Sequence, residues 1–194
     1  MRSGYNIMSI LTGLLILKIV LAVVAIGSFI FFFLAACSIY TNLTTGVPWA
    51  KIPEENIMKI FKEINLPKNF LLYDLGCGDG RVILAAEKFG FRARGFELSL
   101  YPYLKAWLKI KISRSRAEVR RRDFFKENLS QADAVFMFLT GRALVKLSQK
   151  LKQELKPGAK VISNTFSFKK KEPLKKVFVK MPFWGGTNVL VYQF

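Results

Sequence analysis

Residues 73–80 read Tyr-Asp-Leu-Gly-Cys-Gly-Asp-Gly, and this stretch decides which fold the chain is expected to adopt. It follows a short apolar run, 70–74, that predicts a buried strand, and it precedes residues 81–89, whose pattern is helical. Glycine at alternate positions permits positive φ angles and lets a ligand approach the backbone closely. A loop that opens a helix also exposes backbone N–H groups, which favour a carboxylate or a phosphate. We therefore expect a ligand site at this loop.

Strand and helix patterns alternate on both sides of the loop. A helix is predicted from residue 53 to Ile64, because isoleucine and phenylalanine recur at helical spacing there and Pro67 ends the pattern. Further strands are predicted at 93–98, 118–122, 134–139 and 160–166, and further helices at 101–112 and 143–155. Two last strands, 176–181 and 188–194, flank the turn signal Gly185-Gly186. The alternation predicts an α/β fold with a mostly parallel sheet and an antiparallel C-terminal hairpin.

The N-terminal segment has a different composition. Residues 19–40 contain no charged side chain, and the run from Phe29 to Leu34 shows no polar face. A helix over 19–40 would cover roughly 30 Å, the thickness of a bilayer's hydrocarbon core. The sequence thus predicts a transmembrane anchor in residues 1–45, with 41–50 as a linker, and one further domain in residues 46–194.

Composition excludes several kinds of chemistry. The chain has 194 residues and no histidine, which removes imidazole acid–base catalysis, Ser-His-Asp triads and most zinc sites. No metal site is expected. Of the 31 Lys and Arg, 29 lie in residues 46–194 together with all 13 Asp and Glu, a net charge of +16. Such a field favours anionic partners, and beside a membrane anchor the simplest of these is the phospholipid headgroup.

Spacing within the loop bears on the ligand. A dinucleotide-binding loop would carry a third glycine at position 81, which is arginine here. The pattern G-x-G-x-G with an acid two residues before it resembles the S-adenosylmethionine (SAM) loop of class I methyltransferases. Glu97 follows roughly 20 residues further on, at the end of the next predicted strand, where a carboxylate can accept both ribose hydroxyls.

A closer resemblance covers residues 47–168. The stretch Val47-Pro48-Trp49, the glycine loop, Gly95-Phe96-Glu97-Leu98, Asp123-Phe124 and residues 154–159 resemble the membrane-anchored mitochondrial protein-lysine methyltransferases. Those enzymes modify the ATP synthase c subunit and the adenine nucleotide translocase, and they have prokaryotic relatives. The resemblance implies a Rossmann-like methyltransferase domain with SAM as its cofactor. It also implies SAM-binding residues at Asp74, Gly76, Cys77, Gly78, Gly80, Glu97, Leu98, Asp123 and Phe124, with Asp123 and Phe124 at the adenine.

The acceptor is the least determined feature. Trp49, Thr140 and Asn164, with Phe138 and Phe166, are expected near a substrate pocket from their places before the loop and at strand ends. A lysine of a membrane-associated protein is the expected acceptor. RNA stays open as an alternative because residues 105–122 are rich in Lys and Arg. A lipid or quinone acceptor, and a non-catalytic SAM-binding protein, stay open as well.

Topology follows from the cofactor rather than from charge. Basic residues flank residues 19–40 on both sides, so the positive-inside rule does not orient the chain. Because SAM is cytosolic, we expect a single-pass membrane protein with its catalytic domain on the cytoplasmic side. The alternative is that Leu34-Ala35-Ala36-Cys37 is a lipoprotein processing box, which would export the domain.

Overall fold

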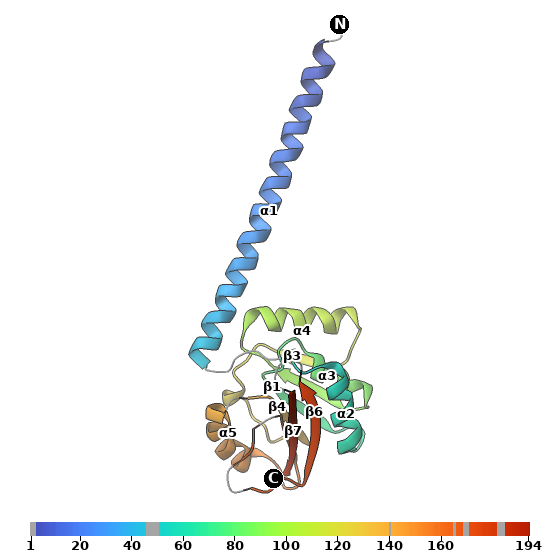
Figure 1. The fold of residues 1–194 in the computed structure, drawn as a ribbon, viewed down its shortest axis with the longest axis vertical. Coiled ribbons are helices and arrows are strands. Elements are labelled where there is room, and N and C mark those ends of the chain that lie inside the picture. Colours follow the sequence, from blue (N-terminus) through green and yellow to red (C-terminus); the bar gives the residue numbers. More distant parts are fainter. Residues whose placement is uncertain (1–2, 46–50, 140, 165, 169–170, 182–184) are drawn as a thin grey trace. The chain divides into compact units, whose positions relative to one another are not determined.

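The structure is a computed structural model that describes residues 3–45, 51–139, 141–164, 166–168, 171–181 and 185–194. Its contacts divide the chain into two compact units, Met1–Cys37 and Ser38–Phe194. The first unit is formed by helix α1, Ser3–Thr45, which continues into the start of the second (Figure 1). Within α1, the stretch Ile7–Tyr40 contains an 18-residue window with a mean hydropathy of 2.8, and none of that window is buried.

The second unit is built on a seven-stranded sheet with the order β3-β2-β1-β4-β5-β7-β6. The first five strands in that order are parallel, and β7 runs antiparallel to both β5 and β6. The strands are β1 Leu71–Leu75, β2 Arg92–Phe96, β3 Glu118–Arg120, β4 Ala134–Met137, β5 Lys160–Asn164, β6 Lys175–Met181 and β7 Gly185–Gln193. The predicted α/β fold, mostly parallel with an antiparallel C-terminal hairpin, is confirmed.

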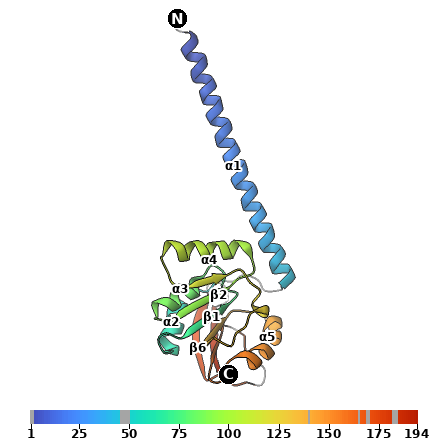
Figure 2. The same ribbon diagram turned by 180° about the vertical axis from the view of Figure 1, so that it is seen from behind.

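Helices cover both faces of the sheet (Figures 1 and 2). They are α2 Glu54–Ile64, α3 Arg81–Lys88, α4 Leu100–Ile112 and α5 Gly141–Glu154, with a short 3-10 helix, η1, at Phe124–Lys126. One apolar core includes Ile57 and Phe61 of α2, Ile83 of α3 and Ile110 of α4. The other core includes Leu147 and Leu151 of α5.

The two cores follow from the alternation of side chains along each strand. Leu72 of β1 and Phe136 of β4 face the core with α2 and α3. Tyr73 and Val135, their neighbours in the chain, face the core with α5. Because both faces of the parallel strands are buried, β1 and β4 are apolar almost throughout. Asp74 is the charged exception, and it lies near the C-terminal end of β1, just before the glycine loop.

Three sequence-based predictions of local structure were wrong in detail. The linker expected at residues 41–50 is helical as far as Thr45, because residues 41–45 contain neither glycine nor proline. Gly185 and Gly186 do not form the hairpin turn but pair with Met181 and Lys180 as the first residues of β7. The third strand ends at Arg120, so Asp123 lies beyond the strand and caps η1.

Candidate functional site

The candidate site lies where β1 and β2 end side by side. In their register, Asp74 is opposite Gly95 and Leu75 is opposite Phe96. The loop after β1 returns to β2, because the N–H groups of Gly76 and Cys77 both donate to the carbonyl of Phe96, at 2.9 and 3.0 Å. Parallel strands place their carboxyl ends at one edge of a sheet, and ligands of such sheets bind outside that edge. Asp74 and Glu97, distant in sequence, therefore belong to one site.

The loop adopts the conformation that its glycines permit. Gly76, Gly78 and Gly80 have φ angles of 80°, 55° and 78°, in the left-handed region that other residues rarely adopt. A further glycine is required from outside the loop. A Cβ atom on Gly95 would lie 2.5 Å from the Cys77 sulfur, so the loop can rest on β2 only because position 95 has no side chain. The Cys77 side chain is thereby buried between the loop and Gly95 of β2.

Glu97 holds the loop from the neighbouring strand. Its Oε2 accepts a hydrogen bond of 2.9 Å from the backbone N–H of Gly78, and its Oε1 accepts one of 2.8 Å from the N–H of Ser99. Burial raises the pKa of this carboxyl, while the backbone donors oppose the shift. A carboxylate offers about four lone pairs, so acceptor capacity is left for a ligand.

Asp74 is the least satisfied polar group of the site. Its side chain is buried, and among the described residues Oδ2 has no hydrogen-bond partner. Burial, followed by repulsion from Glu97 and Asp79, raises the pKa of Asp74 well above its ordinary value of 3.8. A buried acceptor without a donor is costly. A cationic donor, such as an ammonium group, is the chemistry that would satisfy this position.

The acid inside the loop, Asp79, is held differently. Its carboxylate accepts two hydrogen bonds from Arg81, at 2.8 and 2.7 Å, and one of 2.8 Å from Lys109 of α4. Although burial raises the pKa of Asp79, these bonds lower it well below its ordinary value. Arg81 also donates to the carbonyl of Ile52, at 2.9 Å. The ion pairs thus tie the loop to α4 and to the segment before α2.

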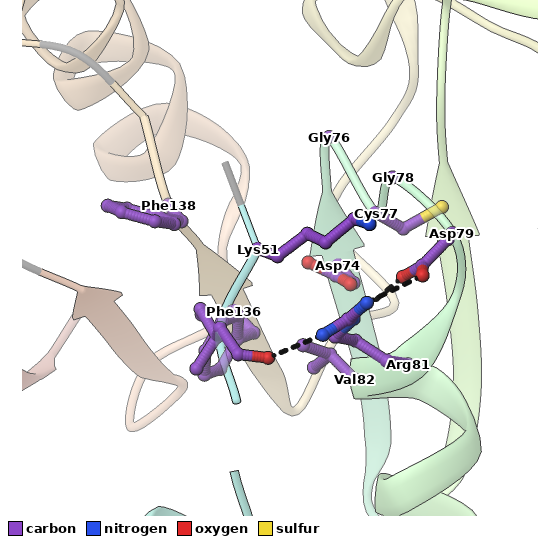
Figure 3. Close-up of a pocket in the computed structure, with 11 residues that line it drawn as sticks. Lys51, Asp74, Gly76, Cys77, Gly78, Asp79, Arg81, Val82, Phe136 and Phe138 are labelled. Carbon is purple, nitrogen blue, oxygen red and sulfur yellow. Dashed lines mark hydrogen bonds and ion pairs between the residues drawn. The ribbon is translucent and has the colours of Figure 1, made fainter. Parts of the chain in front are cut away.

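A pocket opens beside the loop (Figure 3). Asp74, Gly76 and Gly78 line it together with Phe136 and Phe138. The Lys51 side chain runs past the Asp74 carboxylate toward the glycine loop. The pocket therefore combines a buried carboxylate, a lysine ammonium group and two aromatic rings.

The structure brings together only some of the expected residues. Phe138 lines the pocket with the loop, as expected for a residue at the end of β4. Leu98 is 39% exposed directly after Glu97. Asn164 is fully buried at the end of β5 and is not among the residues that line this pocket. Trp49 and Thr140 lie outside the described residues.

Asp123 and Phe124 do not line this pocket, and Asp123 instead lines a separate hollow with Phe125 and Lys146 of α5. The Asp123 carboxylate accepts from the N–H of Phe125 at 3.0 Å, and the Phe124 ring is tilted against that of Phe125 with centroids 4.5 Å apart. Phe166 packs at the edge of the core under α5. The expected adenine-binding residues are thus held by contacts with their neighbours in the chain.

Sequence reasoning missed Lys51, Arg81 and Phe136 as residues that line the pocket. For Arg81 a signal existed, since arginine stands where a dinucleotide loop has its third glycine. For Phe136 there was none, because an apolar residue in a buried strand carries no mark of the cavity beside it. No cluster of metal-binding side chains occurs within the described part of the chain.

Comparisons with known proteins agree with this geometry. The family description "ANTKMT methyltransferase domain" matches residues 74–175. The chain is 32% identical over 152 residues to a protein-lysine N-methyltransferase of Saccharolobus islandicus, a match that covers 76% of this chain and 92% of the archaeal protein. It is 33% identical over 126 residues to the lysine N-methyltransferase of Rattus norvegicus that is named for the c subunit of ATP synthase, covering 63% of this chain and 56% of the rat protein.

A solved structure is similar as well. The RNA methyltransferase of Salinibacter ruber, in complex with S-adenosyl-L-homocysteine, aligns with a TM-score of 0.68 and 27% identity. This alignment covers 74% of the present chain and 93% of the bacterial one.

Proposed function

Because the chain belongs to the ANTKMT methyltransferase family and its cofactor is SAM, we propose that it methylates a lysine of a membrane-associated protein. The observation that carries this proposal is the match to an archaeal protein-lysine methyltransferase along 92% of that protein's length. The family description, which matches residues 74–175, spans the glycine loop together with Asp74 and Glu97.

The residues at the site fit the cofactor. Asp74, with its unpaired Oδ2, would accept from the ammonium group of the methionine part, and Glu97 would accept from the ribose hydroxyls. The loop residues Gly76, Cys77, Gly78 and Gly80 offer backbone atoms at close range. Leu98, Asp123 and Phe124 would meet the adenine. When bound, SAM supplies a methyl group on a positively charged sulfur, which a nucleophile displaces directly.

The protein's part in the reaction is alignment and desolvation. A lysine amine has a reference pKa of about 10.4 and must be neutral to act as a nucleophile. Aromatic walls such as Phe136 and Phe138 disfavour the charged form of an amine that enters between them. Holding the amine in line with the reacting methyl group supplies much of the remaining acceleration. Trp49 and Thr140 stay candidates for the acceptor side of the pocket, and Asn164, which does not line it, stays a candidate for a position behind that side.

Helix α1 would anchor the enzyme. Within Ile7–Tyr40 only Lys18 is charged, and the absence of buried residues leaves an apolar surface all round the helix. At about 1.5 Å per residue this stretch is roughly 50 Å long, so it exceeds the bilayer core and can tilt or extend beyond it. We call residues 46–194, which carry the candidate site, the catalytic unit, and we propose that it lies on the cytoplasmic side, where SAM is made.

Charge favours an acceptor at the membrane. A net charge of +16 over residues 46–194 repels strongly cationic protein tails and attracts an anionic lipid surface. The rat relative acts on the c subunit of ATP synthase, as its name states. A lysine of an integral membrane protein close to the headgroups fits both observations.

The test is to incubate the full chain and isolated membranes with tritiated SAM and to follow the label into protein, RNA and lipid. We expect label on protein lysines, and a Glu97→Ala enzyme should transfer little of it. Glu118→Ala is the matched control, because it removes the same charge from a surface residue of β3 that pairs with Arg94 and Arg120. Label found in lipid alone, or faster methylation of a soluble basic peptide than of any membrane fraction, would contradict the proposal.

RNA is the second candidate acceptor. The similarity to an RNA methyltransferase at 27% identity favours it, as do the many Lys and Arg between residues 105 and 122. The same experiment decides between the two, because label that ribonuclease removes and protease does not would assign the enzyme to RNA.

A further inference from the structure

Helix α4 has apolar residues on the side that faces away from its own domain. Its inner side is formed by Pro102, Ala106 and Ile110, which are buried and spaced four residues apart. The opposite side carries Leu104, Trp107, Leu108 and Ile112, which are 39%, 45%, 52% and 74% exposed. We call these four side chains the outer face of α4. A helix that is apolar on both sides is expected to be covered on both sides.

No described element of the catalytic unit covers this outer face. Figures 1 and 2 show α4 at the periphery of that unit, with the sheet and α3 on one side only. The other exposed large apolar residues of this unit are spread over different elements, among them Val145 of α5 and Phe178 of β6. Four such residues on one face of one helix form a patch, and a patch of this kind marks an interaction site.

Charge around the patch selects the partner. Between Leu98 and Ala117 the chain has no acidic residue, while Lys111, Arg114 and Arg116 are exposed at the C-terminal end of α4. A tryptophan and leucines flanked by lysine and arginine are the composition of helices that lie in the plane of a bilayer surface. A purely apolar protein partner would give no reason for the basic residues, whereas anionic headgroups do.

The covalent connection keeps such a surface within reach. If Tyr40 ends the membrane span, five helical residues at about 1.5 Å each lead to Thr45 and seven more at up to about 3.5 Å each lead to Ile52, so the catalytic unit stays within roughly 30 Å of the bilayer. This step rests on the proposed function, because it takes α1 to span the membrane.

We propose that the outer face of α4 inserts into the interface of an anionic lipid bilayer and thereby orients the catalytic unit on the membrane. The inner side of the same helix contacts the candidate site. A Cβ atom on Gly80 would lie 3.0 Å from that of Ala106, and Lys109 is paired with Asp79. A helix with side chains is about 10 Å across, so insertion brings the glycine loop close to the headgroups. An acceptor lysine at the membrane surface then lies within reach.

The test uses the full chain in nanodiscs whose lipids carry bromine on the upper acyl chain, which quenches nearby tryptophan. The signal of Trp107 is the difference between the wild-type chain and Trp107→Phe. In nanodiscs that contain phosphatidylglycerol, we expect roughly half or more of this signal to be quenched, since interfacial helices insert about 5–10 Å. In phosphatidylcholine alone, or in 1 M salt, quenching should fall several-fold.

Variants test whether the apolar side chains of the outer face are what inserts. Leu104→Glu combined with Leu108→Glu should abolish quenching of Trp107, whereas Val145→Glu, at a residue 65% exposed on α5, should not. A shift in unfolding temperature on adding S-adenosylhomocysteine checks that each variant is folded. The comparison of wild type with Trp107→Phe needs no such variant, so the proposal stays testable if the double substitution fails to fold.

Two results would overturn the proposal. One is an unquenched Trp107 in the anionic nanodiscs. The other is a Trp107 shielded from a water-soluble quencher in detergent, together with a dimer in sedimentation, which would make the outer face a contact between copies of the chain. Quenching of Trp107 without methyl transfer to protein would support insertion of the outer face and contradict the proposed function. Methyl transfer to protein without quenching would support the proposed function and contradict insertion.

Discussion

Replacing Glu97 by alanine should weaken binding of the cofactor and destabilise the glycine loop by separable amounts. The carboxylate accepts from the backbone N–H groups of Gly78 and Ser99, at 2.9 and 2.8 Å, and both donors are buried with it. A buried donor that loses its acceptor costs about 1–3 kcal/mol. Loss of both should lower the free energy of unfolding by about 2–6 kcal/mol, less where water enters from the pocket.

Binding of the cofactor should also weaken, because the ribose hydroxyls lose the carboxylate that would accept their hydrogen bonds. A hydrogen bond to a charged group is worth about 1.5–3 kcal/mol, which corresponds to roughly a 10- to 100-fold rise in the dissociation constant. Isothermal titration with S-adenosylhomocysteine measures this affinity, and chemical denaturation without ligand measures stability. Glu118→Ala, which removes an equally charged but half-exposed group from the edge strand β3, should leave both values nearly unchanged.

The reasoning is refuted if the Glu97→Ala protein unfolds cooperatively and still binds S-adenosylhomocysteine within about threefold of the wild-type affinity. In that case the carboxylate would act on the loop alone, and the ribose would be held elsewhere.

Three further predictions concern the acid of β1, the packing beneath the loop and the anchor. Burial, with two neighbouring carboxyls, raises the pKa of Asp74, so the native state binds more protons than the unfolded state and stability falls as the pH rises above about 4. Asp74→Asn should flatten this pH dependence when thermal unfolding is measured between pH 5 and 8, and the ligand-free variant should be at least as stable as the wild type at pH 7. In titration calorimetry the dissociation constant for S-adenosylhomocysteine should rise at least about tenfold. An unchanged slope would contradict the assignment. Gly95→Ala places a Cβ 2.5 Å from the Cys77 sulfur and should cost about 1–3 kcal/mol in denaturation, and adding Cys77→Gly should recover part of it. No recovery would show that the loop is displaced for another reason. Arginine at both Ile26 and Ile30 adds about 2.5–3.5 kcal/mol each to insertion, so alkaline carbonate should release this variant from membranes but not the wild type; equal retention would argue against a span.

The sequence alone determined the features that depend on local pattern. Alternation of strand and helix periods predicted the parallel sheet, because a buried parallel strand must be apolar on both faces. The alternating glycines marked the loop, because positive φ at Gly76, Gly78 and Gly80 is a requirement of the backbone itself. Glu97 could be found because its distance from the loop follows from one strand–helix–strand unit.

The tertiary structure alone decided what depends on contacts between distant segments. The sequence around Gly95 does not show that a side chain at this position would collide with Cys77. The sequence around Asp79 does not show that this carboxylate pairs with Lys109 of α4. Phe136 lines the pocket because β4 pairs with β1 in the sheet, which places it beside Asp74. The sequence of α4 does not show which side of the helix is buried, because both sides are apolar. Only the packing of Pro102, Ala106 and Ile110 against the rest of the unit identifies the buried side. Local sequence restricts backbone angles directly, whereas neighbours in space depend on the whole chain.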